Sequence, residues 1–295
     1  MATEVNLAQL RALVAVAEAG GFGAAGEELG ISQSAVSHAI AALERALGGP
    51  VLHRGGDVRP TPLGREILPH ARAAVTSADA VAAVAARRRG APAGTVRLAA
   101  PSTVCQGLLP GLLREWQAAH PRVRVRVFEG EDGELGAWLE SGTVDAAVLV
   151  DPDAAPPGAL PLAEDSMHAL LRDDHPLAAE PVIDVRDLDD DPFLLSEGGC
   201  ERQIREIYRQ AGARFRPGHR IRELATVIGM VRAGIGVSVM PGLARAMLPA
   251  GCVLVPLAPR VRRRLVLTGP AGRPWHPAVT ALLETAALYG GVRSD

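Results

Sequence analysis

The chain has 295 residues, 48% of them hydrophobic, and a formal net charge of −2 at pH 7, so it is long enough for more than one buried core. It lacks an apolar run of membrane-spanning length, a basic-then-apolar leader, and CxxC spacing among its three cysteines. These features argue against a transmembrane protein, an exported disulfide framework and a zinc site. We therefore expect a cytoplasmic protein without a bound metal or cofactor.

Two short helices are predicted near the N-terminus. The first apolar stripe ends at Gly20 and Gly21, and the second is followed by Gly30, a natural C-terminal turn residue. The two stripes consist of Leu10, Leu13, Val14 and Ala17, then Phe22, Ala25 and Leu29. A short turn containing glycine before a third helix with a polar face is typical of a helix-turn-helix.

The third helix is predicted between Ile31 and Leu47 and has two unlike faces. Ser32 stands at the N-cap position, and Gly48 and Gly49 end the pattern. The apolar face holds Val36, Ile40, Leu43 and Leu47, and the other face holds Ser34, Ser37, His38, Ala41 and Arg45. Because solvated helix faces usually carry Glu, Lys and Arg, a face of short polar groups favours contact with the major groove of DNA. A purely structural three-helix bundle is the alternative.

A hairpin is predicted between Val51 and Pro60, in the position of the wing of a winged helix. Arg54 and Arg59 in this hairpin are placed to meet DNA phosphates. Residues 1–92 are nearly balanced in charge, so a single copy would hold DNA weakly. We therefore expect several copies to bind one site.

A long helix is predicted from Pro62 to Arg89. It carries a heptad seam made of Ile67, Ala71, Ala74, Ala78, Val81 and Ala85. Pro69 lies inside the pattern and is expected to kink the helix. We interpret the segment as a dimerisation helix that ends in a hinge over Arg87–Gly94, and a surface helix packed on its own domain is the alternative.

From Thr95 onward, strands alternate with helices, which predicts parallel α/β sheets. The strands are expected at 96–100, 123–128, 146–150, 193–195 and 237–240, and the helices near 106–119, 132–142, 200–211 and 223–233. This length suits two subdomains, with the chain crossing between them near Pro161–Asp165 and Arg263–Gly269.

Two loops are candidates for effector binding. Ligands of such sheets bind beyond the carboxyl ends of strands, often at helix N-termini, and the loops Pro101–Cys105 and Ser196–Cys200 fit that position. The expected effector contacts are Ser102, Thr103, Ser196, Gly199 and Cys200, with Thr226 of another helix as a further candidate. Capped helices in ordinary turns are the alternative.

Segments along the first 64 residues resemble the DNA-binding domain of LysR-type transcriptional regulators. The matching segments are Leu10–Arg11, Val14–Glu18, Gly20–Phe22, Ala24–Ala25, Leu29, Ser32–Ser37, Ile40, Leu43–Glu44, Leu47–Gly48, Arg54 and Thr61–Gly64. The C-terminal half matches more loosely, through Leu109–Pro110, Asp145–Ala147, Val231–Val237 and Met240–Pro241. Gly21 and Gly23 stand where the family usually has hydroxyl residues, Ser34 replaces a common proline, and Asp57 lies near the usual wing arginine.

The resemblance implies an α/β protein with an N-terminal winged helix-turn-helix, a linker helix and a two-subdomain fold like that of type 2 periplasmic binding proteins. Its implied partners are double-stranded DNA with an inverted repeat, an unknown small-molecule effector and further copies of itself, as a homodimer or homotetramer. RNA polymerase is a further candidate partner. By the resemblance, Ser32, Gln33, Ser34, Ser37 and His38 would reach DNA, and Arg45, Arg54 and Arg59 are added as candidate contacts.

The expected domains are residues 1–61 for DNA binding, 62–92 for the dimerisation helix and hinge, and 93–295 for effector binding. Within the last, subdomain I is expected at 93–163 plus 267–295 and subdomain II at 164–266. No GxSxG, HExxH, Walker or GxGxxG motif occurs, so we predict a regulator and not an enzyme.

Cys200 allows an alternative function as a thiol-based peroxide sensor. A thiol at a helix N-terminus has its thiolate favoured by the helix dipole. The run Leu194–Cys200 also resembles the reactive-cysteine loop of peroxide-sensing members of the family. Arg209 stands where the resolving cysteine is expected, which leaves Cys105 as the candidate substitute. Buried cysteines acting as small hydrophobic residues are the simpler interpretation.

Overall fold

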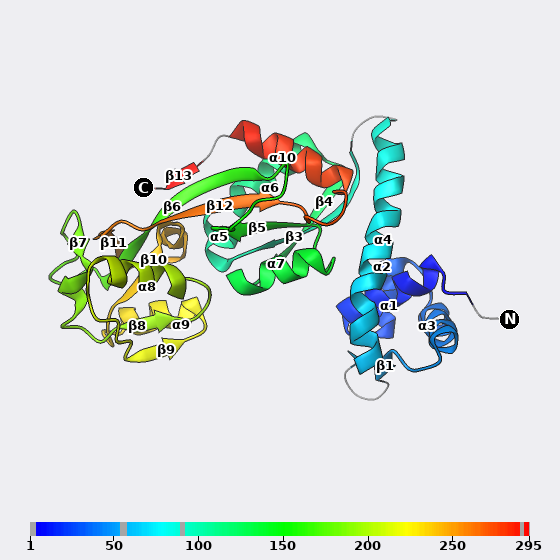
Figure 1. The fold of residues 1–295 in the computed structure, drawn as a ribbon, viewed down its shortest axis with the longest axis horizontal. Coiled ribbons are helices and arrows are strands. Elements are labelled where there is room, and N and C mark those ends of the chain that lie inside the picture. Colours follow the sequence, from blue (N-terminus) through cyan, green and yellow to red (C-terminus); the bar gives the residue numbers. More distant parts are fainter. Residues whose placement is uncertain (1–3, 54–57, 89–91, 290–291, 295) are drawn as a thin grey trace.

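The computed structural model describes residues 4–53, 58–88, 92–289 and 292–294. It consists of a helical N-terminal domain, one long helix and an elongated α/β domain (Figure 1). The N-terminal elements are α1 (Leu7–Ala19), α2 (Phe22–Leu29), α3 (Gln33–Leu47), β1 (Leu52–His53), β2 (Arg59–Pro60) and α4 (Pro62–Arg88). The three predicted helices are confirmed, with Ser32 as the N-cap of α3 and Gly48 as its left-handed C-cap.

The N-terminal helices pack through the apolar stripes that the sequence predicts. The buried side chains include Leu13, Val14, Val36, Ile40 and Leu43. The turn between α2 and α3 needs the small residue Gly26, because a Cβ there would lie 2.8 Å from the carbonyl oxygen of Ile31. The approach of these two helices is thus fixed by backbone contact.

Helix α4 continues through Pro69, and its two ends have different surroundings. Leu68 and Ala71 are buried in the core of the N-terminal domain, and Ile67 packs against it. Farther along, Val81 is 72% exposed and Val84 is 54% exposed. The expectation of one continuous dimer seam is therefore wrong at Ile67 and Ala71, because a helix that begins directly after a domain packs on that domain first.

The regulatory domain is built around one large sheet. Its elements are β3 (Gly94–Ala100), α5 (Ser102–Gly107), α6 (Leu109–Ala119), β4 (Val123–Glu129), α7 (Asp132–Glu140), β5 (Ala146–Val150), β6 (Leu160–Arg172), β7 (Ile183–Asp184), η1 (Val185–Leu188), β8 (Leu194–Ser196), α8 (Glu201–Gln210), β9 (His219–Ile221), α9 (Leu224–Arg232), β10 (Ser238–Pro241), η2 (Gly242–Met247), β11 (Cys252–Ala258), β12 (Arg262–Thr268), α10 (Pro277–Tyr289) and β13 (Val292–Ser294). The main strand order is β4-β3-β5-β12-β6-β11-β7, with β10 and β13 also paired to β6.

The sheet is mixed, whereas the sequence predicted parallel sheets. Strands β4, β3 and β5 are parallel neighbours, but β12 is antiparallel to both β5 and β6, and β11 and β10 are antiparallel to β6. The prediction was incomplete because it treated 161–165 and 263–269 as crossings and not as parts of long strands. The antiparallel strands carry the chain between the two halves of the domain.

Separate hydrophobic clusters define the subdomains on either side of that crossing. In subdomain I, helices α6 and α10 pack against one face of β3, β5 and β12, while α7 covers the other face. In subdomain II, α8 and α9 belong to two further clusters around β6, β10 and β11. Along β6, Ala163 belongs to the first core and Met167 to the second, so the passage between subdomains lies beside Asp165.

Candidate DNA-binding face and regulatory cleft

The outer face of α3 presents most of the predicted DNA-contact residues to solvent. Ser32, Gln33, Ser34, His38 and Arg45 are exposed and Ser37 is half-buried. The Ser32 hydroxyl accepts a hydrogen bond from the Ala35 amide at 3.2 Å and lies 2.9 Å from the Ser34 hydroxyl. The opposite face of α3 is held in the core, so the orientation of this polar face is fixed.

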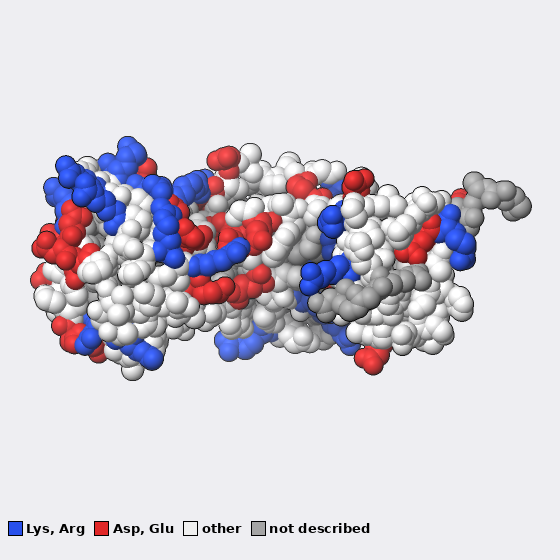
Figure 2. All heavy atoms as spheres, turned by 90° about the horizontal axis from the view of Figure 1, so that it is seen from below, with Lys and Arg blue, Asp and Glu red and all other residues white. Residues whose placement is uncertain are grey.

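The predicted wing is an antiparallel pair of two-residue strands. Leu52 is paired with Pro60 and His53 with Arg59. Arg59 is exposed on β2, whereas Arg54 lies outside the described residues. On the side drawn in Figure 2, acidic and basic atoms are intermixed over the regulatory domain and the N-terminal end is mostly uncharged. DNA affinity from such a surface depends on the placement of a few side chains.

A buried ion pair lies where the two subdomains meet. Arg263 on β12 faces Asp165 on β6, and the guanidinium Nε and Nη2 donate to the two carboxylate oxygens, each at 2.8 Å. The two side chains are 1% and 0% exposed. Burial acts to lower the pKa of Arg263, but the hydrogen bonds and charge of Asp165 outweigh it and leave the pKa above its ordinary value. Arg263 therefore remains charged inside the protein.

Arg263 brings together the two loops that the sequence singled out. Its Nη2 donates to the Thr103 hydroxyl at 3.4 Å, and its Nη1 donates to the Cys200 Sγ at 3.9 Å. Thr103 lies in the first turn of α5 in subdomain I, and Cys200 is the N-cap of α8 in subdomain II. One side chain thus contacts both subdomains.

Two further residues of the loop Ser196–Cys200 have unusual surroundings. The Ser196 hydroxyl oxygen is buried and has no hydrogen-bond partner among the described residues. Gly199 has a φ of 110°, and a Cβ there would lie 3.0 Å from the Asp132 carboxyl carbon. Burial raises the pKa of Asp132 to about 6, with Arg263 and Arg202 acting in the opposite direction.

Two of the predicted effector contacts lie elsewhere. The Ser102 hydroxyl donates to the Glu129 carboxylate. Thr226 is exposed near the start of α9 and, among the described residues, has no hydrogen bond to Arg263 or its neighbours. Of the six candidates, Thr103 and Cys200 contact Arg263 directly, and effector binding by any of the six stays a prediction.

Sequence reasoning missed the charged residues around a cavity where the two subdomains meet. Asp151 accepts from the Gln203 amide at 3.0 Å and from the Arg264 backbone N–H at 2.7 Å. A cavity of about 400 Å³ opens beside them. A signal existed in the run Arg262–Arg264, since alternation along a strand must turn the middle arginine inward when its neighbours face solvent.

The two candidate redox thiols belong to different cores. Cys105 packs against the core of subdomain I, and Cys200 is buried in that of subdomain II. Burial raises the pKa of Cys105 to about 12, and Glu129 acts in the same direction. Burial also raises the pKa of Cys200 to about 11, despite the opposing charge of Arg263. Both groups are therefore thiols near neutral pH.

Comparison with known proteins identifies the family. Residues 7–65 match a family model described as "Bacterial regulatory helix-turn-helix protein, lysR family", and residues 89–288 match the LysR substrate binding domain. The chain belongs to the LysR family. It is therefore a DNA-binding transcriptional regulator with an effector-binding domain, and the predicted fold class is confirmed.

Individual LysR relatives cover most of the chain. It is 32% identical over 291 residues to YvbU, an HTH-type transcriptional regulator of Bacillus subtilis (strain 168), covering 97% of this chain and 99% of that protein. It is 38% identical over 241 residues to a "Probable hydrogen peroxide-inducible genes activator" of Mycobacterium avium, covering 80% and 78%. Among solved structures, a full-length OxyR variant from Pseudomonas aeruginosa has a TM-score of 0.75 at 27% identity, covering 97% and 95%.

The described part of the chain lacks two further features. No helix there combines the length and apolar character needed to cross a bilayer. No group of three or more His, Cys, Asp or Glu side chains in the same ranges is arranged to hold a metal ion.

Proposed function

We propose that this LysR-family regulator binds an inverted repeat in promoter DNA as a homo-oligomer and responds to a small polar effector in the cleft around Arg263. The observation that carries the proposal is the contact of Arg263 with Thr103 of one subdomain and Cys200 of the other. An effector that competes for these hydrogen bonds changes how the subdomains close.

Selection of genomic DNA fragments tests the DNA-binding half of the proposal. Wild-type protein should enrich an inverted repeat, and the Ser34→Ala/Ser37→Ala variant should lose roughly tenfold or more in affinity for it, since base-edge contacts carry that discrimination. Gln117→Ala, which changes an exposed residue of α6, is the matched control. Equal enrichment by wild type and the double variant would contradict the role of α3 as the recognition helix.

The outer end of α4 supports a dimer. Val81 and Val84 are exposed there, and the exposed Ala85 lies one turn beyond Val81. Sedimentation should show that Val81→Glu dissociates the oligomer, whereas Ala118→Glu on α6 leaves it intact. A dimer that survives Val81→Glu would place the contact elsewhere. Tetramer assembly and contact with RNA polymerase stay predictions of the family resemblance, and a cytoplasmic location stays a prediction from composition.

A thermal-shift screen with organic acids, amino acids and sugar phosphates tests the effector site. A true effector should raise the melting temperature of wild type and have less effect on Thr103→Val, which removes one hydroxyl next to Arg263. Equal stabilisation of both proteins would locate the compound outside this cleft.

Peroxide sensing by Cys200 is the second candidate function. It is favoured by the position of Cys200 at the N-terminus of α8 beside Arg263, and by the names of the peroxide-responsive relatives. The raised pKa of the thiol opposes it, because the thiolate is the reactive form. Mass spectrometry after exposure to hydrogen peroxide separates the two functions. Rapid oxidation of Cys200 with altered DNA binding would favour the sensor, and an unmodified thiol would favour the effector.

A further inference from the structure

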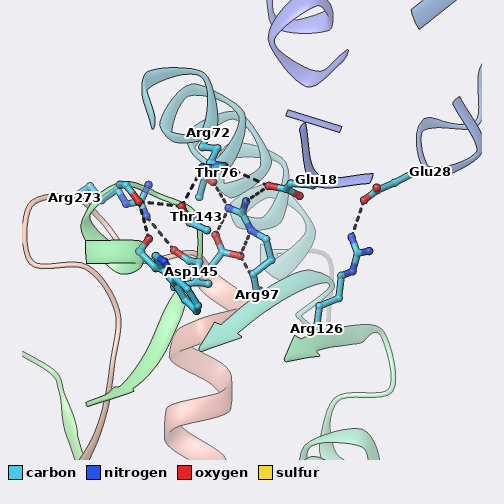
Figure 3. A network of polar contacts seen from close by, with 12 residues as sticks. Glu18, Glu28, Arg72, Thr76, Arg97, Arg126, Thr143, Asp145 and Arg273 are labelled. Atoms are coloured by element: carbon cyan, nitrogen blue, oxygen red, sulfur yellow. Dashed lines mark hydrogen bonds and ion pairs between the residues drawn. The ribbon is translucent and has the colours of Figure 1, made fainter. Parts of the chain in front are cut away.

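A cluster of polar side chains joins three parts of the chain far from the cleft (Figure 3). We name it the joint cluster. Its members are Glu18 on α1, Arg72 and Thr76 on α4, and Arg97, Thr143 and Asp145 in subdomain I. The DNA-binding domain, the linker helix and the regulatory domain thus meet at one place.

Arg97 on β3 is the centre of the joint cluster. Its Nε and Nη2 donate to the Asp145 carboxylate at 3.1 and 2.9 Å, and its backbone N–H donates to the same carboxylate at 2.9 Å. The Nη2 also donates to the Thr76 hydroxyl at 2.9 Å, and the Nη1 to Glu18 at 3.4 Å. Arg97 therefore contacts its own subdomain, the linker helix and the helix-turn-helix together.

Glu18 also accepts a hydrogen bond from a second arginine, which lies on the linker helix. Arg72 Nε donates to the Glu18 carboxylate at 3.4 Å, while Arg72 Nη1 donates to the Thr143 hydroxyl at 3.1 Å. The Glu18 side chain is 18% exposed, so water screens these contacts only in part. A separate, more exposed pair, Arg126 with Glu28 on α2, also joins the two domains.

The strands that carry the joint cluster also lead to the cleft. Arg97 lies on β3, which ends just before Thr103, and Asp145 directly precedes β5, which ends just before Asp151. Arg97 and Asp145 are joined by reciprocal backbone and side-chain hydrogen bonds, which link the two strands at this end. The distance along β5 from Asp145 to Asp151 is about 20 Å, from the rise per residue of a strand.

We propose that the joint cluster is a latch that holds the helix-turn-helix in a fixed orientation on subdomain I, with Glu18 as the residue that opens and closes it. Charge-assisted hydrogen bonds of this size are strong enough to favour one arrangement and weak enough to be exchanged for water. Two nitrogens of the nearby Arg273, Nε and Nη1, are buried without a partner among the described residues. These nitrogens are hydrogen-bond donors next to the joint cluster that its carboxylates could use in a different arrangement.

A second part of the inference rests on the proposed effector function. Closure of the cleft at Thr103 and Asp151 would tilt β3 and β5, and so displace Arg97 and Asp145 from Glu18. Effector binding would then change the position of the DNA-binding domain within the same chain, in addition to any change between subunits.

Hydrogen–deuterium exchange of the full-length free protein tests the latch without DNA or effector. Glu18→Gln should make the amides of residues 14–20 and 72–80 exchange roughly fivefold faster, as expected for loss of one charge-assisted hydrogen bond. Glu27→Gln removes the same charge from an exposed position on α2 and should leave these rates unchanged. Wild-type exchange rates in Glu18→Gln would overturn the latch.

Neutral variants keep the test valid if Glu18→Gln fails to fold. Thr76→Val and Thr143→Val remove hydrogen bonds to Arg97 and Arg72 without changing charge, and together they should accelerate exchange in the same two segments. Thr103→Val at the cleft tests transmission, since faster exchange at residues 14–20 supports it and unchanged exchange there overturns it. These outcomes are independent of whether any compound binds the cleft.

Discussion

Two arginine–aspartate pairs of the regulatory domain share the same hydrogen-bond geometry but have different surroundings. Arg263 and Asp165 at the subdomain crossing are 1% and 0% exposed, whereas Arg97 and Asp145 at the joint are 13% and 6% exposed. The first pair contacts residues of the regulatory domain alone, and the second also contacts α1 and α4. Water does not reach the first pair, so the bond between Arg263 and Asp165 is kept as part of the fold, whereas the partly exposed contacts of the joint cluster can rearrange.

Replacing Arg263 should have the largest effect. Arg263→Met leaves the Asp165 carboxylate buried and unpaired, and should lower the free energy of unfolding by about 3–5 kcal/mol. Chemical denaturation of the full-length protein measures it. The control is Arg262→Met on the same strand, whose side chain is 65% exposed. Equal losses in the two variants would contradict a special role for the buried pair.

Replacing Arg97 should have an intermediate effect on stability. Arg97→Met leaves the Asp145 carboxylate without its guanidinium partner, but water can approach it at the domain edge. We therefore expect the free energy of unfolding to fall by about 2 kcal/mol. Denaturation followed with probes in both domains checks this value. A loss as large as that of Arg263→Met would show that the joint cluster is as rigid as the buried pair of Arg263 and Asp165.

The cleft should respond to pH through Asp132. Its pKa of about 6 in the folded protein exceeds its ordinary value of 3.8, so the folded state holds the proton more tightly than the unfolded chain. This contribution to stability is complete below pH 4, decreases as the pH rises to 6, and is absent above. Because the group is partly exposed, we expect about 1 kcal/mol between these limits.

Asp132→Asn isolates that contribution. The variant should lose the part of the pH dependence that lies between pH 4 and 6, as measured by denaturation at several pH values. If wild type and variant change in parallel across this range, Asp132 is not the titrating group.

The exposed pair between the two domains should have the smallest effect. Arg126 and Glu28 are 54% and 36% exposed, and Arg126→Gln should cost no more than about 0.5 kcal/mol. Amide exchange at residues 14–20 should stay at the wild-type rate. Acceleration equal to that of Glu18→Gln would mean that the two domains are held by their whole contact area, without a central latch.

The N-terminal domain could be predicted from sequence almost entirely. Ser32, the apolar stripe of α3 and Gly48 act over a few residues, so their pattern fixes the limits of the helix. The regulatory sheet was harder, because antiparallel strands buried on both faces lack the alternation that marks a strand at the surface. Ile67 and Ala71 fit a heptad seam equally well whether they face a partner or their own domain.

The sequence by itself determined the family and the helix-turn-helix, and it singled out the loops Pro101–Cys105 and Ser196–Cys200, since each depends on residues close together in the chain. Only the tertiary structure decided that the loops meet on Arg263 and that Glu18 meets Arg97. Arg263 lies 98 residues from Asp165 and 160 from Thr103, and Arg97 lies 79 from Glu18. No local pattern specifies such pairs, because they form only when whole strands and domains have packed.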